Sequence, residues 1–496
     1  MKKIFFIVIT LWGFSSCSDF LEPKSPDEYV PKSADALNEM LLGNAYAKTD
    51  NTSSLFAYHN ILDDDVEVTN EPISYNVSID DFSMLYSWDP DMLNVAGAIN
   101  VWGNYYRMIL GANAALDYLK DVKGGNEEKT YVAAQAYGLR AFYYFNLVNL
   151  FGEPYGYNKK ALGVPLKLAS DLTDGFDKRN TVEEVYDQIV RDLDEAERCF
   201  LSLPKDLQYP ATYRISLPAV QLIRARVALH MNNRAEAAKY ARKVIEEWEF
   251  ELYDLNSFSG TYNNPYPNFV TLDNPEMIWA MENSNNVVNL LRQNYGYLDL
   301  SGPTGKRNTL NVSQSLLKCY EKGEDLRVGY YFANDYDRKA IEGVYVPWGK
   351  MLLSYNGAVS SGNFGYALRL SEAYLILAET VYDTDEALAL KLINDLREKR
   401  YQTGTDYQVA YSGDELLNFI REERRRELCF EGQRWFDLRR YGMPGFKRQW
   451  MDKGVRIGSY VMEKDDPAYT LPIPSVVIER NPALVQNKLA ARKTLQ

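Results

Sequence analysis

Two clusters of carboxylates are the residues of this sequence whose types and spacing could do chemistry. Asp63, Asp64 and Asp65 are consecutive, and Asp80 and Asp81 follow in the same aromatic segment. Such clusters could supply a glycosidase acid–base pair or the oxygen ligands of a calcium ion. Glycoside hydrolysis, however, needs two carboxyl groups that flank the scissile bond, and adjacent residues of one loop seldom provide that geometry. We therefore expect a solvated or sugar-binding loop, with no catalytic residue and no cofactor; calcium stays an open alternative.

The residues that other common catalytic sites need are scarce. The chain has 2 histidines, His59 and His230, so a His-based metal site or a Ser-His-Asp triad would have to use one of them. Beyond the N-terminal segment the cysteines are Cys199, Cys319 and Cys429, with no CxxC spacing. We interpret them as small buried hydrophobic residues and predict no metal site.

Aromatic and polar residues are concentrated in three long segments without helical periodicity, residues 55–96, 250–307 and 330–365. Long aperiodic segments of a compact protein are usually functional or disordered, and the aromatic content argues against disorder. Sugars commonly stack on Trp and Tyr while carboxylates and amides bind their hydroxyls. By position and type we predict that six residues contact ligand: Trp88, Tyr86, Asp65, Tyr295, Tyr297 and Trp348.

The elements that must position these segments are helical pairs. Small and apolar residues at helical spacing surround short turns at about 101–152, 216–247 and 366–400. Such pairs resemble tetratricopeptide hairpins, but their uneven spacing excludes a regular solenoid. We predict a mainly all-α fold in which these hairpins form a scaffold and the long irregular insertions form a binding face.

The final predicted helix, residues 414–441, contains an unusual run of charges. If it is one continuous helix, Arg424 and Glu431 share its apolar stripe with Leu428 and Trp435. Burying that stripe requires both ions to be paired, because an unpaired buried charge costs several kcal/mol. Gly432 in the helix interior then needs a close-packing reason, and Gly442 reads as the residue that ends the helix.

The N-terminus has the features of a targeting segment. Lys2 and Lys3 precede an apolar stretch over 4–14, and two serines lead to Cys17. This arrangement resembles a bacterial lipoprotein signal, which predicts a signal peptide over 1–16, a lipidated Cys17 at the start of a tether over 17–32, and one domain over 33–496. An ordinary secretory signal with an incidental cysteine is the alternative. The net charge of -13 argues against nucleic acid as a partner.

Four ordered motifs resemble one known family. The stretch RRELCFEGQRWFDLRRYG over 425–442 closely resembles the signature of the SusD/RagB family. Residues 369–379 look like the central helix of that family, residues 471–487 are similar to its closing segment, and residues 101–116 resemble an early helix. Cys429 is a departure, since a plainer small residue is common there. With the lipoprotein-like start, the resemblance covers nearly the whole chain.

The resemblance implies a surface-exposed lipoprotein of the outer membrane that captures nutrients, usually glycans. It also implies a mostly α-helical fold with tetratricopeptide-like hairpins and a partner, a SusC-like TonB-dependent barrel over which the lipoprotein sits as a lid. The helical face would dock on the barrel and the loops would face ligand. Two alternatives stay open: a lid of the same kind that captures peptides or glycopeptides, and a surface glycoside hydrolase.

Overall fold

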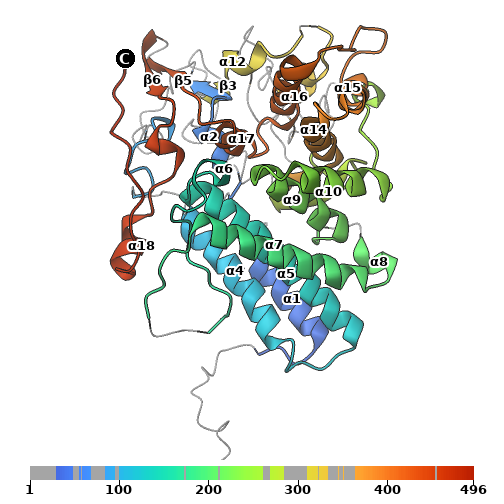
Figure 1. Ribbon diagram of the computed structural model, residues 1–496, viewed down its shortest axis with the longest axis vertical. Helices are drawn as coiled ribbons and strands as arrows, with labels where there is room; N and C mark the ends of the chain where they lie inside the picture. The colour runs from blue at the N-terminus through green and yellow to red at the C-terminus, as the bar shows by residue number, and fades with distance from the viewer. Residues whose placement is uncertain are drawn as a thin grey trace, which may run out of the picture.

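The computed structural model describes residues 30–47, 55–56, 58–68, 84–94, 100–171, 175–210, 213–260, 269–283, 310–321, 323–332, 345, 350, 364–452 and 455–496. Within these ranges the fold is mainly helical, as predicted, and three two-stranded sheets accompany the helices (Figure 1). No helix of the described ranges is long and apolar enough to cross a bilayer. The predicted lipidation site, Cys17, lies outside them.

The helices in chain order are α1 (Ala34–Ala45), α2 (His59–Leu62), α4 (Val101–Tyr118), α5 (Asn126–Phe151), α6 (Tyr155–Asn158), α7 (Val182–Leu201), α8 (Lys205–Gln208), α9 (Leu217–His230), α10 (Arg234–Glu246), α12 (Gln314–Leu317), α13 (Arg327–Tyr330), α14 (Leu370–Val381), α15 (Glu386–Glu398), α16 (Gly413–Leu428), α17 (Arg434–Arg440) and α18 (Ser475–Arg480). The three predicted hairpins are confirmed as α4–α5, α9–α10 and α14–α15.

Helix α5 is the centre of the scaffold. From Gly138 to its end at Phe151 every side is buried, because α1, α4 and α7 pack around it (Figure 1). Helix α7 was not singled out by the sequence reasoning, although its start carries a capping box. The Thr181 hydroxyl accepts from the Glu184 N–H at 3.2 Å, and the Glu184 carboxylate accepts from the Thr181 N–H at 2.8 Å.

The strands are β1 (Val66–Val68), β2 (Met277–Asn283), β3 (Leu310–Val312), β4 (Phe364–Arg369), β5 (Phe446–Asp452) and β6 (Val455–Met462). They form three antiparallel pairs, β1–β3, β2–β4 and β5–β6. The third predicted helical pair, which began at residue 366, is therefore wrong in its first turn. Residues up to Arg369 belong to β4, and α14 begins at Leu370.

The prediction of one continuous helix over 414–441 is also wrong. Helix α16 ends at Leu428 and α17 begins at Arg434, and the turn between them contains two positive φ angles, +59° at Phe430 and +71° at Gly432. Gly432 is therefore a turn residue and not a helix interior. Its close-packing role is real, because a Cβ at Gly432 would lie 3.1 Å from the Phe56 carbonyl oxygen. Gly442, at φ +89°, follows the end of α17 as predicted.

The buried charges of α16 form what we call the central ion-pair network, built around the carboxylate of Glu427. Arg400 donates to both of its oxygens, at 2.9 and 3.0 Å. Arg369 and Arg327 add bonds of 2.9 and 3.2 Å, and the Tyr331 hydroxyl adds another of 3.1 Å. All these side chains are fully buried, so the network joins α16 to α13, β4 and the end of α15 through charge-assisted bonds.

The two ions predicted to lie on the buried stripe are indeed buried and paired. Arg424 donates from Nε to Asp437 Oδ2 at 2.8 Å, which links α16 to α17. Glu431 accepts from Arg369 and from Lys350 Nζ, at 2.7 and 2.6 Å. Arg424 and Glu431 therefore stabilise the packing of the core and are not exposed for ligand binding.

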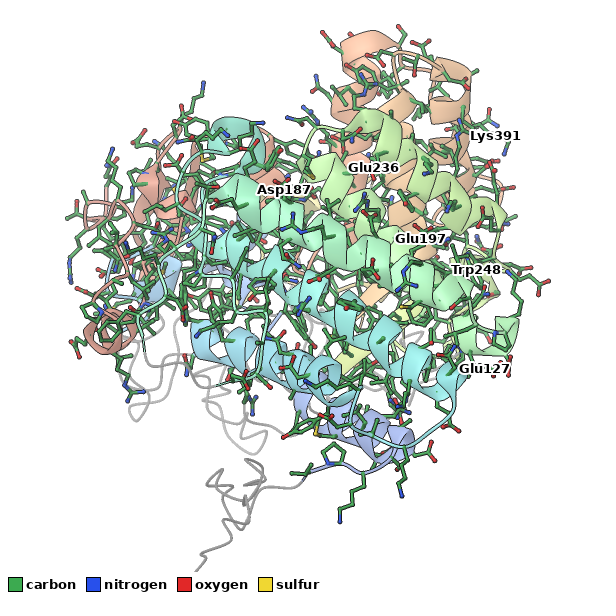
Figure 2. The ribbon with its side chains drawn as sticks, turned by 60° about the horizontal axis from the view of Figure 1, so that its bottom comes forward. Glu127, Asp187, Glu197, Glu236, Trp248 and Lys391 are labelled. Carbon is green, nitrogen blue, oxygen red and sulfur yellow. The ribbon has the colours of Figure 1, made fainter. Side chains whose placement is uncertain are left out.

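The outer face of the helical scaffold carries many carboxylates among basic side chains. Figure 2 shows Glu127 near the start of α5, Asp187 and Glu197 on α7, and Glu236 on α10, spread along one side of the molecule. Some of these carboxylates are already paired; Glu197, for example, accepts from Lys243 at 2.7 Å. This face is hydrated and charged, in keeping with the negative net charge of the chain.

Candidate functional site

The structure describes three of the six predicted ligand residues, and all three are buried. Trp88 is 1% exposed, and Tyr86 and Asp65 are 0% exposed. In this conformation they lie beneath the surface and do not form an open stacking platform. The other three, Tyr295, Tyr297 and Trp348, lie outside the described residues.

Trp88 and Tyr86 hold an arginine from the C-terminal hairpin. The guanidinium carbon of Arg448, on β5, lies 3.9 Å from the Trp88 ring centroid and 4.0 Å from the Tyr86 ring centroid. Trp88 Nε1 donates to the Leu62 carbonyl at 2.8 Å, and the Tyr86 hydroxyl donates to the Gln449 carbonyl at 2.8 Å. Both polar tips are thus used internally, so these two aromatics clamp the β5–β6 hairpin onto the segment that follows α2.

The aspartate cluster is paired with arginines of the signature segment. Arg434 binds Asp64 with two bonds, Nε to Oδ1 at 2.7 Å and Nη2 to Oδ2 at 2.8 Å. Arg425 donates to Asp65 Oδ1 at 2.7 Å. Asp63 Oδ1 accepts from the Asp65 N–H at 2.9 Å. The Asp64 and Asp65 carboxylates therefore connect the first insertion to α16 and α17, whereas the Asp63 carboxylate bonds within its own loop.

The electrostatics of this cluster oppose a calcium ion. One oxygen from each of the three carboxylates lies within 4.8 Å of the other two, close enough for a shared ion. Burial opposes the ionisation of Asp64, but the charges of Arg425 and Arg434 outweigh it and lower its pKa. Burial and the neighbouring carboxylates raise the pKa of Asp63. The Arg425 and Arg434 guanidinium groups already hold both oxygens of Asp64 and Oδ1 of Asp65, whereas Oδ2 of Asp65 is buried without a hydrogen-bond partner among the described residues. These two positive charges already balance Asp64 and Asp65, which disfavours a calcium ion, and the carboxyl groups of three consecutive residues do not flank a glycosidic bond.

An open groove lies on another side of the molecule, where α4, the connection over 159–180 and the C-terminal segment meet. It has a volume of about 340 Å³, and its wall includes Trp102, Tyr106 and Leu110 of α4 together with Val477 and Leu484. We call this the α4 groove. Its polar groups mostly bond within the protein. Asn113 Nδ2, for example, donates to the Lys167 carbonyl at 2.9 Å, and the Tyr106 hydroxyl donates to the Pro165 carbonyl at 2.8 Å.

Exposed apolar side chains gather on the same three segments as the α4 groove. Phe176 and Val485 are 60% and 61% exposed, which is unusual for residues of this size. The full set on these segments is Leu110, Leu162, Leu168, Phe176, Val476, Val485 and Leu489. The sequence reasoning missed this surface. The one local sign of this surface in the sequence is Leu110, an apolar residue that lies off the apolar stripe of α4.

Comparisons with known proteins agree with this architecture. Residues 19–229 match a family model described as "Starch-binding associating with outer membrane", and residues 350–489 match the model of the SusD family. The chain belongs to the SusD/RagB family. This confirms the resemblance that the four motifs indicated.

Relatives and solved structures of this family resemble the chain over most of its length. SusD-like protein P2 of Formosa agariphila is 26% identical over 431 residues, which are 78% of this chain and 79% of that protein. A crystal structure of a SusD superfamily protein from Bacteroides thetaiotaomicron superposes with a TM-score of 0.71 at 22% identity, covering 92% of this chain and all of the other. A structure named as a laminarin-binding SusD-like protein gives a TM-score of 0.65 at 20% identity, covering 92% of this chain and 99% of the other.

The SusD-like motifs of this chain serve the scaffold wherever the structure describes them. In the closing segment, Asn487 Nδ2 donates to the Phe151 and Leu471 carbonyls at 2.9 and 2.7 Å, and Gln486 and Ile473 exchange two bonds of 2.8 Å each. These bonds tie the C-terminal segment to the end of α5. The motifs therefore report the SusD-like fold.

Proposed function

We propose that this SusD-like chain captures glycan at the cell surface and delivers it to a SusC-like TonB-dependent barrel. Cys17 carries the lipid that anchors it to the outer membrane. The observation that carries the proposal is the pair of family matches in chain order, one of them described as starch-binding and associated with the outer membrane. The laminarin-binding structure that shares the fold also supports a glycan ligand.

We place the ligand where the long insertions leave the scaffold. Val68 pairs with Leu310, so the segments that follow residue 68 and precede residue 310 leave one end of the β1–β3 sheet. Asn283 likewise pairs with Phe364 at the end of β2–β4. The predicted ligand residues Tyr295, Tyr297 and Trp348 belong to the insertions that these strands anchor.

In this proposal the three buried residues that were predicted to contact ligand act instead as supports of the ligand site. Trp88, Tyr86 and Asp65 fix the base of the first insertion against the C-terminal hairpin and α16, as their contacts with Arg448 and Arg425 show. Stacking on sugar rings then falls to the other three aromatics, and an exposed aromatic typically contributes about 1 kcal/mol or more to such a contact.

The barrel is proposed to dock on the α4 groove and its apolar rim. The outer face of α5, α7 and α10 carries carboxylates and is well hydrated, whereas the groove combines an open apolar wall with polar groups that already have partners (Figure 2). Protein interfaces bury apolar patches of this kind. This placement refines the expectation that a helical face meets the barrel, since α4 supplies one wall.

Calorimetric titration of the purified protein with a panel of oligosaccharides, laminarin included, tests the proposal. We expect saturable binding to at least one glycan class, and loss of that binding in Trp348→Ala with an unchanged melting temperature. Binding to peptides or glycopeptides alone would favour the alternative function, a lid that captures peptides or glycopeptides. Release of reducing ends from a polysaccharide would favour a hydrolase, and Asp64→Asn would then be the variant to assay.

A further inference from the structure

Three buried arginines have no carboxylate of a described residue within 4.0 Å. They are Arg179, Arg439 and Arg448, whereas the buried arginines of the central ion-pair network are all paired. Burial lowers the pKa of each of the three to about 10. A buried guanidinium without a counter-ion is costly, so each needs another source of compensation.

Two of these arginines are compensated by backbone carbonyls or aromatic rings of the protein. Arg179 donates to four backbone carbonyls, at 2.7 to 2.9 Å. Arg448 lies between the Trp88 and Tyr86 rings and donates to the carbonyls of Ile61, Asp63 and Tyr86, so that only its Nε is buried without a hydrogen-bond partner among the described residues.

Arg439, on α17, is the exception. One of its nitrogens, Nη2, donates to the Gly152 carbonyl, but Nε and Nη1 are buried and have no hydrogen-bond partner among the described residues. Leaving buried donors unpaired costs about 1–3 kcal/mol each, and more when the group is charged. Glu153 is the carboxylate whose charge acts on Arg439, but the two side chains form no ion pair, and Glu153 Oε2 is itself buried without a hydrogen-bond partner among the described residues.

A small cavity lies beside Arg439. It has a volume of about 120 Å³ and is bounded by the end of α9, by α6, by α5 and by α17. Its lining is cationic or neutral and contains no carboxylate: Asn149, Pro154, Tyr155, Gly156, Tyr157, His230, Asn232, Phe436, Arg439, Arg440 and Gly442. Arg440 is already paired with Glu379 and Asp437, so Arg439 is the cation of this lining that forms no ion pair with a described residue.

A second unpaired group lines the same cavity. His230 Nε2 is buried without a hydrogen-bond partner among the described residues, and burial lowers the pKa of His230 well below its usual value. The ring is therefore neutral at pH 7 and can carry its proton on Nε2 as a donor. A polar, roomy cavity beside a buried cation is suited to an anion or to water, and the charge of Arg439 favours the anion.

We propose that this cavity binds a small monovalent anion, chloride or a carboxylate of similar size, between Arg439 and His230. The anion supplies the hydrogen-bond acceptor and the negative charge that Arg439 lacks, and it fastens α17 to the ends of α5 and α9. This inference does not rest on the proposed glycan binding. The stability of the fold then depends on the concentration of this anion.

Thermal melting in chloride, bromide or acetate, each compared with gluconate at equal ionic strength, tests the proposal. Gluconate is too large for the cavity. We expect the small anions to raise the melting temperature by a few degrees, with saturation that follows one-site linkage. Gly156→Leu should abolish this rise, because Gly156 lines the cavity, a Cβ there would lie 2.7 Å from Asn232 Nδ2, and the longer side chain would compete for the same space. Gly175→Leu, at a loop position with open space around it, should keep the rise.

Two further measurements make the outcome decisive. A crystal grown in bromide should give an anomalous peak within hydrogen-bond reach of Arg439, and Arg439→Gln should lose the anion-dependent rise. If Arg439→Gln does not fold, the Gly156→Leu comparison carries the test alone. An unchanged melting curve in all four salts, water alone in the cavity, or a Glu153 carboxylate turned onto Arg439 would each overturn the proposal.

Discussion

Replacing Arg424 by alanine should destabilise the protein and leave its affinity for glycan unchanged. Arg424 is fully buried, with one bond of 2.8 Å to Asp437 and an approach of 3.7 Å to Glu372. Removing one partner of a buried ion pair typically costs about 3–5 kcal/mol. Here both carboxylates keep another arginine, since Arg440 binds Asp437 at 2.7 Å and Arg226 binds Glu372 with two bonds. We therefore expect a smaller loss of unfolding free energy, about 2–3 kcal/mol.

Two matched variants allow the losses of unfolding free energy to be ranked. Glu427→Gln removes the charge that Arg327, Arg369 and Arg400 share, so it should reach the full loss of about 4–5 kcal/mol. Arg421→Ala, on the same helix, removes a side chain that is 36% exposed and pairs with Glu379 at 3.3 Å, and should cost about 0–1 kcal/mol.

Urea unfolding followed by circular dichroism, with glycan titration of each folded variant, measures both quantities. The reasoning fails if Arg424→Ala melts like the wild type, or if Arg421→Ala is as damaging as Glu427→Gln. A variant that loses glycan affinity while keeping its melting temperature would show that α16 contributes to the binding face.

Three further predictions follow from the buried and exposed residues. Burial lowers the pKa of His59 to about 4, below its unfolded value of about 6.5, so the unfolded state takes up the proton first. Up to about 3 kcal/mol of stability should be lost as pH falls from 6.5 to 4, and His59→Phe should flatten that part of the pH–stability curve. Trp88→Ala should lower stability by about 3–5 kcal/mol because the ring is buried, whereas Trp348→Ala should remove glycan binding without a change in melting temperature. Leu110→Asp with Val476→Asp should stop co-purification with the barrel while glycan titration stays normal.

The helical scaffold could be predicted because its signals are local. Small residues around short turns located the three hairpins, and Ser33 caps α1 as its type suggests, accepting from the Ala36 N–H at 3.2 Å. Helix α7 carried an equally local signal in Thr181 and Glu184 and could have been found. The break between α16 and α17 was harder, because a glycine such as Gly432 is compatible with a helix interior or with a left-handed turn.

The candidate site could be predicted only in part, because its contacts join distant parts of the chain. Trp88 and Tyr86 had the right types for sugar stacking, but aromatics of this size also fill cores, and their partner Arg448 lies about 360 positions away. Asp65 and Asp64 similarly pair with Arg425 and Arg434, which lie far away in the sequence. Local pattern cannot reveal such pairings, whereas the burial of Arg424 on α16 followed from helical periodicity. Glu431 is buried as well, but it lies in the turn between α16 and α17 and not on the predicted helical stripe.

Titration of the wild-type protein against a glycan panel, with Trp348→Ala and Trp88→Phe beside it, tests the proposed function most directly. We predict saturable binding to at least one glycan, its loss in Trp348→Ala, and its retention in Trp88→Phe, which keeps a buried ring. Absence of binding to every glycan, or binding that survives in Trp348→Ala, Tyr295→Ala and Tyr297→Ala alike, would contradict glycan capture by the aromatic insertions.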